Sequence, residues 1–380
     1  MSGRWLVLGS HIPAEGRLGG MIRYTVEVLR ALEARPDVDV EVHCQLGAVP
    51  FLADELGIAV DRLHPGATGS TVRDSLIERR GLAWLVERRR PDVVFGTKQL
   101  VPRRVGDELQ VLTVHDLLPF DRPCDFGLAK RFLLPPFYRR SLEEADLLAC
   151  VSAATRDRLL YHLPSIDRRV VVVPNAMTST LRSVETEPIA ELADRRFALV
   201  VGDRSRRKNL GFVVDLWPEV MARQPDAHLA VVGPPGWGRN ERLPGLVDLV
   251  RSGSASTHEL IPDGQLRWAY ERSAVTLCPS LLEGFGLPVL EALSFGCPVV
   301  ISTDPAQAEV AGRRGAAIPV DRPADWVASI LDHLRGSRPT VEPLPERGWA
   351  EVAAELVAAV EHRSSMVARG RPTVARPRRV

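Results

Sequence analysis

The chain has 380 residues, too many for one ordinary hydrophobic core and about the right number for two domains of roughly 100–200 residues each. Its hydrophobic content of 45% and charged content of 26% are those of a well-packed globular protein, and they exclude a collagen-like, coiled-coil or mainly disordered chain. The net charge of +1 gives no overall field that would favour nucleic acid as a partner.

Short β-rich runs alternate with longer helical patterns, as is typical of parallel sheets built from βαβ units. In the first half the expected strands are 5–8, 38–44, 93–95, 111–114, 147–151 and 170–173, and the expected helices are 21–34, 75–89, 130–144 and 153–160. In the second half the expected strands are 198–201, 228–232, 257–260, 275–278 and 299–301, and the expected helices are 209–224, 263–273, 288–294 and 323–335. The pattern predicts an α/β protein with two Rossmann-like, doubly wound parallel-sheet domains.

A polar stretch at 178–195 separates the two series, so we place the first domain at 1–180 and the second at 181–348. An amphipathic helix at 349–362 follows, and packing against the first domain is one option for it. The remaining segment, 363–380, carries six arginines and is expected to be a disordered, solvated tail. Contact of this tail with anionic lipid headgroups is the alternative interpretation.

The cysteines are odd in number and widely spaced, without a CxxC pair, which is typical of reduced thiols. They are Cys44, Cys124, Cys150, Cys278 and Cys297. The apolar run at 4–8 is too short for a signal peptide, and no stretch approaches the ~20 apolar residues of a spanning helix. We therefore expect a cytoplasmic protein, with peripheral contact at the inner membrane face as the variant in which the tail binds lipid.

The segment at 279–292 follows a strand and opens a helix, and it contains Glu283, Glu291 and several glycines. Pro288 stands where a proline fits the first turn of a helix. Doubly wound sheets bind ligands beyond the carboxyl ends of their strands, so we expect an interdomain site here. The free N–H groups of the helix start suit a sugar or phosphate oxygen, and Glu291 could accept hydrogen bonds from ribose hydroxyls.

A second loop, at 202–210, places four cations between a strand and a helix. Such cations repel one another, and a diphosphate is the simple neutralising partner, with Arg207 and Lys208 giving charge-assisted hydrogen bonds. A run of this kind standing alone would be interpreted as a solvated face.

Together these loops resemble the donor site of retaining glycosyltransferases of the GT-B fold, family 4. Glu283 and Glu291 enclose Gly-Phe-Gly-Leu-Pro with the spacing of that family, and 202–209 matches its Gly-x-x-x-x-Arg-Lys-Asn segment. Asp203 departs from relatives that carry an arginine directly after the glycine, so a third cation would have to be Arg204 or Arg206.

Two segments of the first domain fit the same resemblance. Gly19 and Gly20 open a helix and match the family's Gly-Gly loop near the diphosphate and the acceptor. His115 follows a β-branched strand, and with Asp116 it matches a His-Asp pair beside the transferred sugar. Without the resemblance, each would be interpreted as a helix cap or a structural histidine.

The resemblance implies an enzyme that transfers a hexose, mannose-like or glucose-like, from a GDP- or UDP-sugar to a hydroxyl acceptor, with retention of configuration and without a metal. Saccharide acceptors in polysaccharide or glycoconjugate assembly are expected. The residues expected in catalysis are His115, Arg207, Lys208 and Glu283. Those expected to bind the donor are Gly19, Gly20, Gly202, Arg207, Lys208, Ile261, Glu283, Gly284, Phe285, Gly286, Leu287 and Glu291.

Several alternatives stay open at this point. A dinucleotide-dependent oxidoreductase would need Gly-x-Gly-x-x-Gly after the first strand, and the glycines there have the wrong spacing. Tailoring of a small-molecule natural product fits the same scaffold, and a non-catalytic nucleotide-sugar-binding relative is poorly excluded by sequence. The donor base, donor sugar and acceptor depend on pocket shape.

Overall fold

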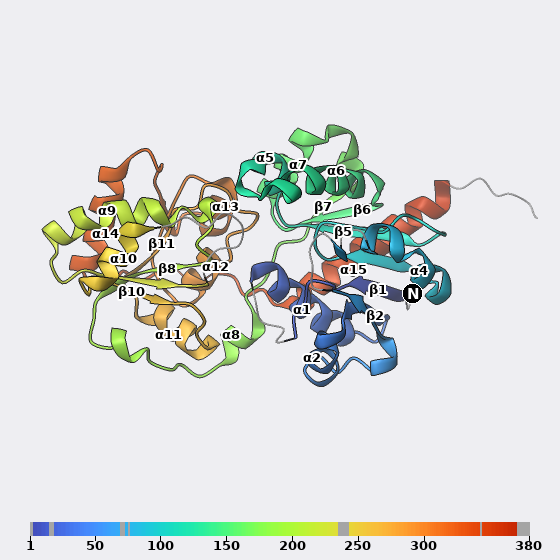
Figure 1. Cartoon of the computed structure of the whole chain (residues 1–380), viewed down its shortest axis with the longest axis horizontal. Coiled ribbons are helices and arrows are strands. Elements are labelled where there is room, and N and C mark those ends of the chain that lie inside the picture. Colours follow the sequence, from blue (N-terminus) through green and yellow to red (C-terminus); the bar gives the residue numbers. More distant parts are fainter. Residues whose placement is uncertain are drawn as a thin grey trace, which may run out of the picture.

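The computed structural model describes residues 3–14, 19–68, 73–74, 77–234, 243–342 and 344–370. It contains two all-parallel sheets, one of seven strands and one of six, each in a lobe of its own (Figure 1). Helices alternate with the strands along the chain in both lobes. The predicted pair of Rossmann-like, doubly wound domains is therefore confirmed.

The first sheet has the strand order β3-β2-β1-β4-β5-β6-β7. Its strands are β1 (Gly3–Leu8), β2 (Val38–Gln45), β3 (Leu63–Ala67), β4 (Val93–Gly96), β5 (Leu109–Val114), β6 (Leu147–Cys150) and β7 (Val170–Val172). All six residues of β5 are buried, as expected for a central parallel strand that is covered on both faces. The strand order reverses between β1 and β4, which places the switch point of this sheet at their carboxyl ends.

Seven labelled helices accompany the first sheet. They are α1 (Gly20–Glu33), α2 (Val49–Asp54), α4 (Ala83–Arg89), α5 (Leu118–Asp121), α6 (Leu128–Glu144), α7 (Ala153–His162) and α15 (Trp349–Gly370). The helix expected over 75–89 is interrupted, because Ile77–Gly81 forms a π-helical turn before α4 begins.

The second sheet has the order β10-β9-β8-β11-β12-β13. Its strands are β8 (Phe197–Val201), β9 (His228–Val232), β10 (Ala255–His258), β11 (Val275–Cys278), β12 (Val299–Ile301) and β13 (Gly315–Ala317). The short helix α8 (Ser179–Ser183) lies in the connection between the sheets. The helices of the second lobe are α9 (Leu210–Arg223), α10 (Pro244–Arg251), α11 (Asp263–Arg272), α12 (Leu287–Ser294), α13 (Pro305–Ala311) and α14 (Pro323–Arg335).

The sequence pattern predicts neither β3 nor β13, which lie at outer edges of the two sheets. β3 contains Pro65 and Gly66, and β13 reads Gly-Ala-Ala, so neither has the run of β-branched residues that indicates a strand. Pairing with the neighbouring strand holds these segments extended, and local propensity does not reveal that.

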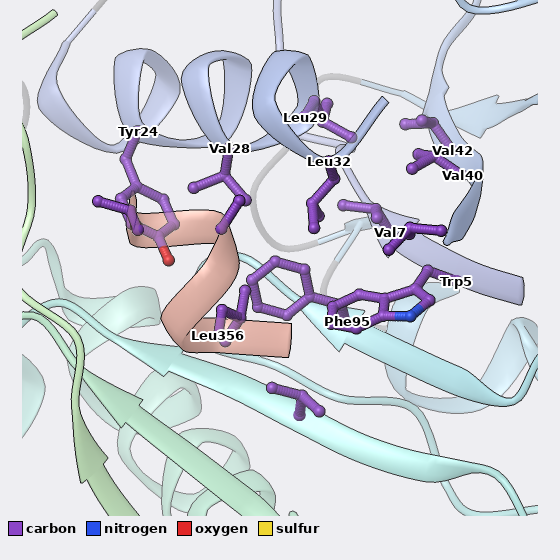
Figure 2. Packing of buried hydrophobic residues seen from close by; sticks show 14 of the residues in the cluster. Trp5, Val7, Tyr24, Val28, Leu29, Leu32, Val40, Val42, Phe95 and Leu356 are labelled. Atoms are coloured by element: carbon purple, nitrogen blue, oxygen red, sulfur yellow. The ribbon is translucent and has the colours of Figure 1, made fainter. Parts of the chain in front are cut away.

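The last helix, α15, returns from the second lobe and packs on the first (Figure 1). Figure 2 shows Tyr24 and Val28 of α1 above Leu356 of α15, with Phe95 of β4 beside them. At its start the Trp349 indole N–H donates to the carbonyl of Met177 at 3.0 Å. The helix runs to Gly370, eight residues past the predicted end at 362, so the tail predicted for 363–380 is helical in its first part. Residues 371–380 lie outside the described ranges.

The domain boundaries at 180 and 348 stay predictions. Searched over the described part of the chain, no helix has both the length and the hydropathy needed to cross a bilayer.

The α15 contact gives a stability prediction. Leu356 is fully buried, with 0% exposure, and Leu356→Ala is expected to lower the stability of the first domain by about 2–5 kcal/mol, because it removes buried apolar contacts and leaves a cavity. The measurement is urea unfolding followed by tryptophan fluorescence. Ala358→Gln, on the exposed face of the same helix, is the control and is expected to change stability by less than about 0.5 kcal/mol.

Candidate active site

Loops from both domains meet where the strands of the two sheets end. His115 directly follows β5, Gly202 follows β8, and Pro279 follows β11. The start of α1 faces the start of α12, since a Cβ at Gly20 would lie 3.4 Å from the Leu287 Cδ1. The strand ends that carry His115, Gly202 and the Glu283 loop are therefore brought to one interdomain region, on the side where α12 and α13 face the first lobe (Figure 1).

At the centre of this region Glu283 forms ion pairs with two cations, Lys208 and Arg207. The Glu283 carboxylate lies 2.6 Å from the Lys208 Nζ and 3.0 Å from the Arg207 Nη1, and its side chain is only 10% exposed. Burial by itself would raise the pKa of Glu283, but the charges of Lys208 and Arg207 outweigh it and lower the pKa to about 2. Glu283 is thus ionised at neutral pH.

The two cations are held by the same contacts. Burial would lower the pKa of Arg207, but the carboxylates of Glu283 and Asp203 raise it above its ordinary value. The Lys208 side chain runs over Gly202, where a Cβ would meet its Cε at 3.1 Å. Gly202 also has φ +143°, a backbone conformation that favours glycine. The glycine therefore leaves the lysine room to lie flat against the strand end.

Backbone contacts tie the basic loop to the loop that carries Glu283. The Leu281 N–H donates to the Arg207 carbonyl at 2.7 Å, and the Asn209 amide donates to the Pro279 carbonyl at 3.2 Å. The Glu283 N–H donates to Asp304 Oδ2 at 3.1 Å. The ion pair is consequently built on a rigid frame, so its geometry needs little rearrangement when a ligand binds.

A hollow beside the ion pair is lined by Gly202, Lys208, Glu283, Gly286 and Gln307, among others. Helix α12 starts here, with Gly286 as its N-cap at φ +104° and a proline in its first turn, as predicted. Its free N–H groups and the paired cations together favour an anionic group with several oxygens, such as a diphosphate. Within the described ranges, no group of three or more His, Cys, Asp or Glu side chains is arranged to hold a metal ion.

His115 belongs to the first domain and lies on the other side of the domain interface. Its Nε2 lies 2.8 Å from the Thr97 carbonyl, which can only accept, so Nε2 carries the proton. Burial lowers the pKa of His115 below its ordinary value, and the ring lies edge-on to Tyr24 at 4.7 Å between centroids. The imidazole is therefore neutral, with the lone pair on Nδ1 as an acceptor.

The two domains approach each other most closely at Gly284. A Cβ there would lie 1.6 Å from the His115 carbonyl oxygen, which no side chain can tolerate. The Gly284 carbonyl accepts hydrogen bonds from the Ser152 hydroxyl at 2.6 Å and the Thr155 hydroxyl at 2.8 Å. Because Gly284 is next to Glu283, this contact sets the Glu283 loop directly against His115.

Three apolar side chains near this contact pack against residues of the first domain: Leu282, Phe285 and Leu287. Phe285 belongs to the core cluster that contains Val151 and Ala176, and Leu287 packs against the same cluster. Leu282 packs with Leu118, Phe126 and Leu134. The donor-binding roles of Phe285 and Leu287 stay predictions, and their side chains already serve interdomain packing, which leaves the backbone as the part able to face a ligand.

The Glu291 carboxylate, which the sequence predicts to bind ribose hydroxyls, already has partners within the protein. It is only 4% exposed, the Tyr270 hydroxyl donates to its Oε2 at 2.7 Å, and the Arg23 guanidinium lies 3.9 Å from its Oε1. Burial raises the pKa of Glu291, although Arg23 and the Tyr270 hydroxyl oppose the rise. A ribose would have to share or replace the Arg23 contact.

The remaining predicted positions are at the edges of the region. Gly19 is the N-cap of α1 with φ +83°, open to its surroundings. Ile261 lies between β10 and α11 and packs against the second domain's core, away from the residues that line the hollow.

Sequence reasoning missed Asp304, which caps α13 through the Gln307 N–H at 3.1 Å and also accepts from the Glu283 N–H. Asp304-Pro305 after a strand is a helix-start signal that could have indicated it. Arg23 and Tyr270, the partners of Glu291, gave no local signal, because each lies far from Glu291 in the sequence.

The Glu283 ion pair gives a pH prediction. Its pKa falls from an ordinary 4.5 to about 2 in the folded protein, so its contribution to stability is complete above pH 4.5 and is lost as the pH falls towards 2. Relative to Glu283→Gln, the wild type is expected to lose roughly 3 kcal/mol over that range, at 1.36 kcal/mol per pKa unit. Denaturant unfolding of both proteins between pH 5 and pH 3 measures the first part of this loss, about 2 kcal/mol, and a stability difference that does not vary with pH would contradict the assignment.

Comparison with known proteins identifies the family. Residues 18–179 match the family described as Glycosyltransferase Family 4, and residues 195–335 match Glycosyl transferases group 1. The chain is 30% identical to O-antigen chain mannosyltransferase B of Escherichia coli over 291 residues, covering 73% of this chain and 72% of that protein. It is 32% identical to an MMP alpha-(1->4)-mannosyltransferase of Mycolicibacterium hassiacum, covering 72% and 70%.

Among solved structures, sucrose-phosphate synthase from Thermosynechococcus elongatus superposes with a TM-score of 0.64 at 18% identity, covering 97% of this chain and 98% of that one. A putative UDP-N-acetylglucosamine 2-epimerase from Listeria monocytogenes gives 0.62 at 14% identity, covering 98% of both. Since these two proteins are named for different reactions, they bear on the fold alone. The sequence relatives decide the family: the chain belongs to glycosyltransferase family 4, with the GT-B fold, and is a glycosyltransferase.

Proposed function

We propose that this enzyme transfers a mannose-like hexose from a nucleotide diphosphate sugar to a hydroxyl group of a saccharide acceptor, with retention of configuration, in polysaccharide or glycoconjugate assembly. The observation that carries the proposal is the partly buried pair of cations, Arg207 and Lys208, held on Glu283 at the strand ends, in a loop whose next residue, Gly284, lies against His115 of the other domain. Each group has a role that its charge state supports.

Arg207 and Lys208 suit the leaving group. Negative charge grows on the departing diphosphate as the sugar bond breaks, and preorganised cations in a site with little water stabilise that charge strongly. The start of α12 at Gly286 adds backbone N–H groups on the same side of the hollow. The diphosphate would share the two cations with Glu283, which stays paired, because two positive charges face a single carboxylate there.

Glu283 and His115 suit the sugar. With a pKa of about 2, Glu283 stays ionised and serves as a hydrogen-bond acceptor for sugar hydroxyls, not as an acid. The neutral His115 offers the Nδ1 lone pair to a donor hydroxyl and adds no positive charge beside the anomeric carbon, where positive charge develops in the transition state.

The reaction course follows the family resemblance. We take the acceptor hydroxyl to attack from the face that the diphosphate leaves, with a diphosphate oxygen accepting its proton, which retains the configuration. No metal enters this scheme, because the two cations neutralise the negative charge of the diphosphate that a metal would otherwise neutralise. Metal independence, like retention, stays a prediction.

The named relatives favour mannose and polysaccharides. Besides the two mannosyltransferases already described, O-antigen chain mannosyltransferase RfbU of Salmonella typhimurium is 25% identical over 86% of this chain. The nucleotide is open between GDP and UDP; an Anabaena protein of the same fold, 13% identical, was solved with UDP-glucose. A cytoplasmic location and a contact with the inner membrane face also stay predictions.

Turnover is expected to depend on Lys208. Lys208→Ala should lower kcat by about 10²–10³-fold and change nucleotide affinity less, because its proposed partner is charge that develops in the transition state. Arg251→Ala is the control: it removes a cation of the same domain whose side chain is 78% exposed and does not line the hollow, and it is expected to leave kcat within about twofold of the wild type. A Lys208→Ala enzyme as active as this control would remove Lys208 from the catalytic set. The assay is transfer of labelled hexose from GDP-mannose, UDP-glucose and related donors to saccharide acceptors.

The proposed donor class is tested by calorimetric titration and thermal shift with UDP, GDP, ADP and dTDP, with and without magnesium. One nucleotide is expected to bind preferentially and independently of magnesium, and to raise the Tm, because a ligand that binds only the folded state stabilises it by mass action. If no nucleotide binds, a non-catalytic relative becomes the better description.

A further inference from the structure

The second domain supplies a cap for a helix of the first. The N–H groups of Ala153 and Ala154, in the first turn of α7, both donate to the Glu309 carboxylate of α13, one to each oxygen, at 2.9 Å. The first turn of a helix has N–H groups without partners and carries a partial positive charge, so a carboxylate is the group that satisfies it best. This cap exists only while the two domains are together.

The same turn of α7 holds the Glu283 loop. Ser152 is the N-cap of α7 and accepts from the Thr155 N–H at 2.9 Å, while its own hydroxyl and that of Thr155 donate to the Gly284 carbonyl. Both hydroxyl residues are buried. The position of α7 therefore decides where Gly284, and with it Glu283, lies relative to His115.

The domains share another directional contact, the Arg23–Asp263 ion pair at 3.1 Å, but it joins α1 to α11 and does not touch α7. Phe285 and Leu282 are buried across the interface, but apolar packing has no direction and tolerates small shifts along the surface. The two-point contact of Glu309 with α7 is directional in both distance and angle. It fixes the register in which the apolar contacts are made.

We propose that Glu309 is a positioning residue for sugar transfer: by capping α7 across the interface, it fixes Ser152 and Thr155 so that they hold the Glu283 loop against His115 in the closed arrangement. Glu309 acts through α7, and it lies outside the residues that line the hollow. Because its carboxylate is exposed, separation of the domains would return both the carboxylate and the N–H groups to water. The kinetic part of this inference rests on the proposed function.

The first test measures closure and needs no substrate. Cys124 is exposed whereas the other four cysteines are buried, so one dye can be placed there. A cysteine replacing Asp248 of α10, whose side chain is 73% exposed, takes the second dye in the other domain. Energy transfer in the full chain, alone and with 1 mM UDP or GDP added, then reports the distance between the domains.

Glu309→Gln and Glu309→Ala are expected to shift the distance distribution to longer values and to raise the population of open molecules about tenfold relative to the wild type, since the interdomain cap is lost. Glu219→Gln is the matched control, because Glu219 is an exposed glutamate of the same domain whose partner, Arg223, lies on its own helix. Distributions that are the same in the Glu309 variants and in the control would overturn the proposal.

The second test separates positioning from plain stability. In the transfer assay, Glu309→Gln is expected to lower kcat about tenfold while the calorimetric Kd for the nucleotide changes by less than about twofold, because the cap acts on the closed state and the predicted diphosphate contacts lie in the second domain. A merely structural residue would lower the Tm and leave kcat unchanged, and that result would also overturn the proposal. If the wild type itself transfers no sugar, the proposed function fails, and the distance measurement still decides whether Glu309 holds the domains closed.

Discussion

The arrangement of this enzyme depends on one close approach between its two domains. At Gly284 the backbone of the second domain lies so near the His115 carbonyl that a Cβ would be 1.6 Å from its oxygen. Only glycine permits that approach, and the hydroxyls of Ser152 and Thr155 then reach the Gly284 carbonyl. The residues on either side follow: Glu283 faces the interface with its two cations, and Phe285 enters the core of the first domain.

The electrostatics of the site rest on paired charges. The side chains of Glu283, Lys208 and Arg207 are only 10%, 13% and 20% exposed, and charges so shielded from water persist only when they are paired. With Glu283 ionised and its two partners charged, these three groups keep one excess positive charge, which favours an anionic ligand. An incoming diphosphate can accept hydrogen bonds from the same two cations that already contact Glu283.

The GT-B fold by itself does not define a reaction, since the same architecture with a TM-score of 0.62 occurs in a putative epimerase. What distinguishes this chain is the set of side chains at the strand ends and the contacts that bring them together across the interface. α15 supports this arrangement without lying in the site. It crosses from the second domain and packs beneath α1, whose first residues face α12.

The sequence by itself determined the two α/β domains, because apolar strand runs and helical spacing are local signals. It also placed Glu283, Arg207 and Lys208 at strand-to-helix turns, where the structure has them. It did not determine the edge strands β3 and β13, which are held by pairing with a neighbour. Nor could it place Arg23 and Tyr270 on Glu291, or Glu309 on α7. Those contacts join residues far apart in the chain and arise only when the second domain packs against the first, so the tertiary structure alone decided them.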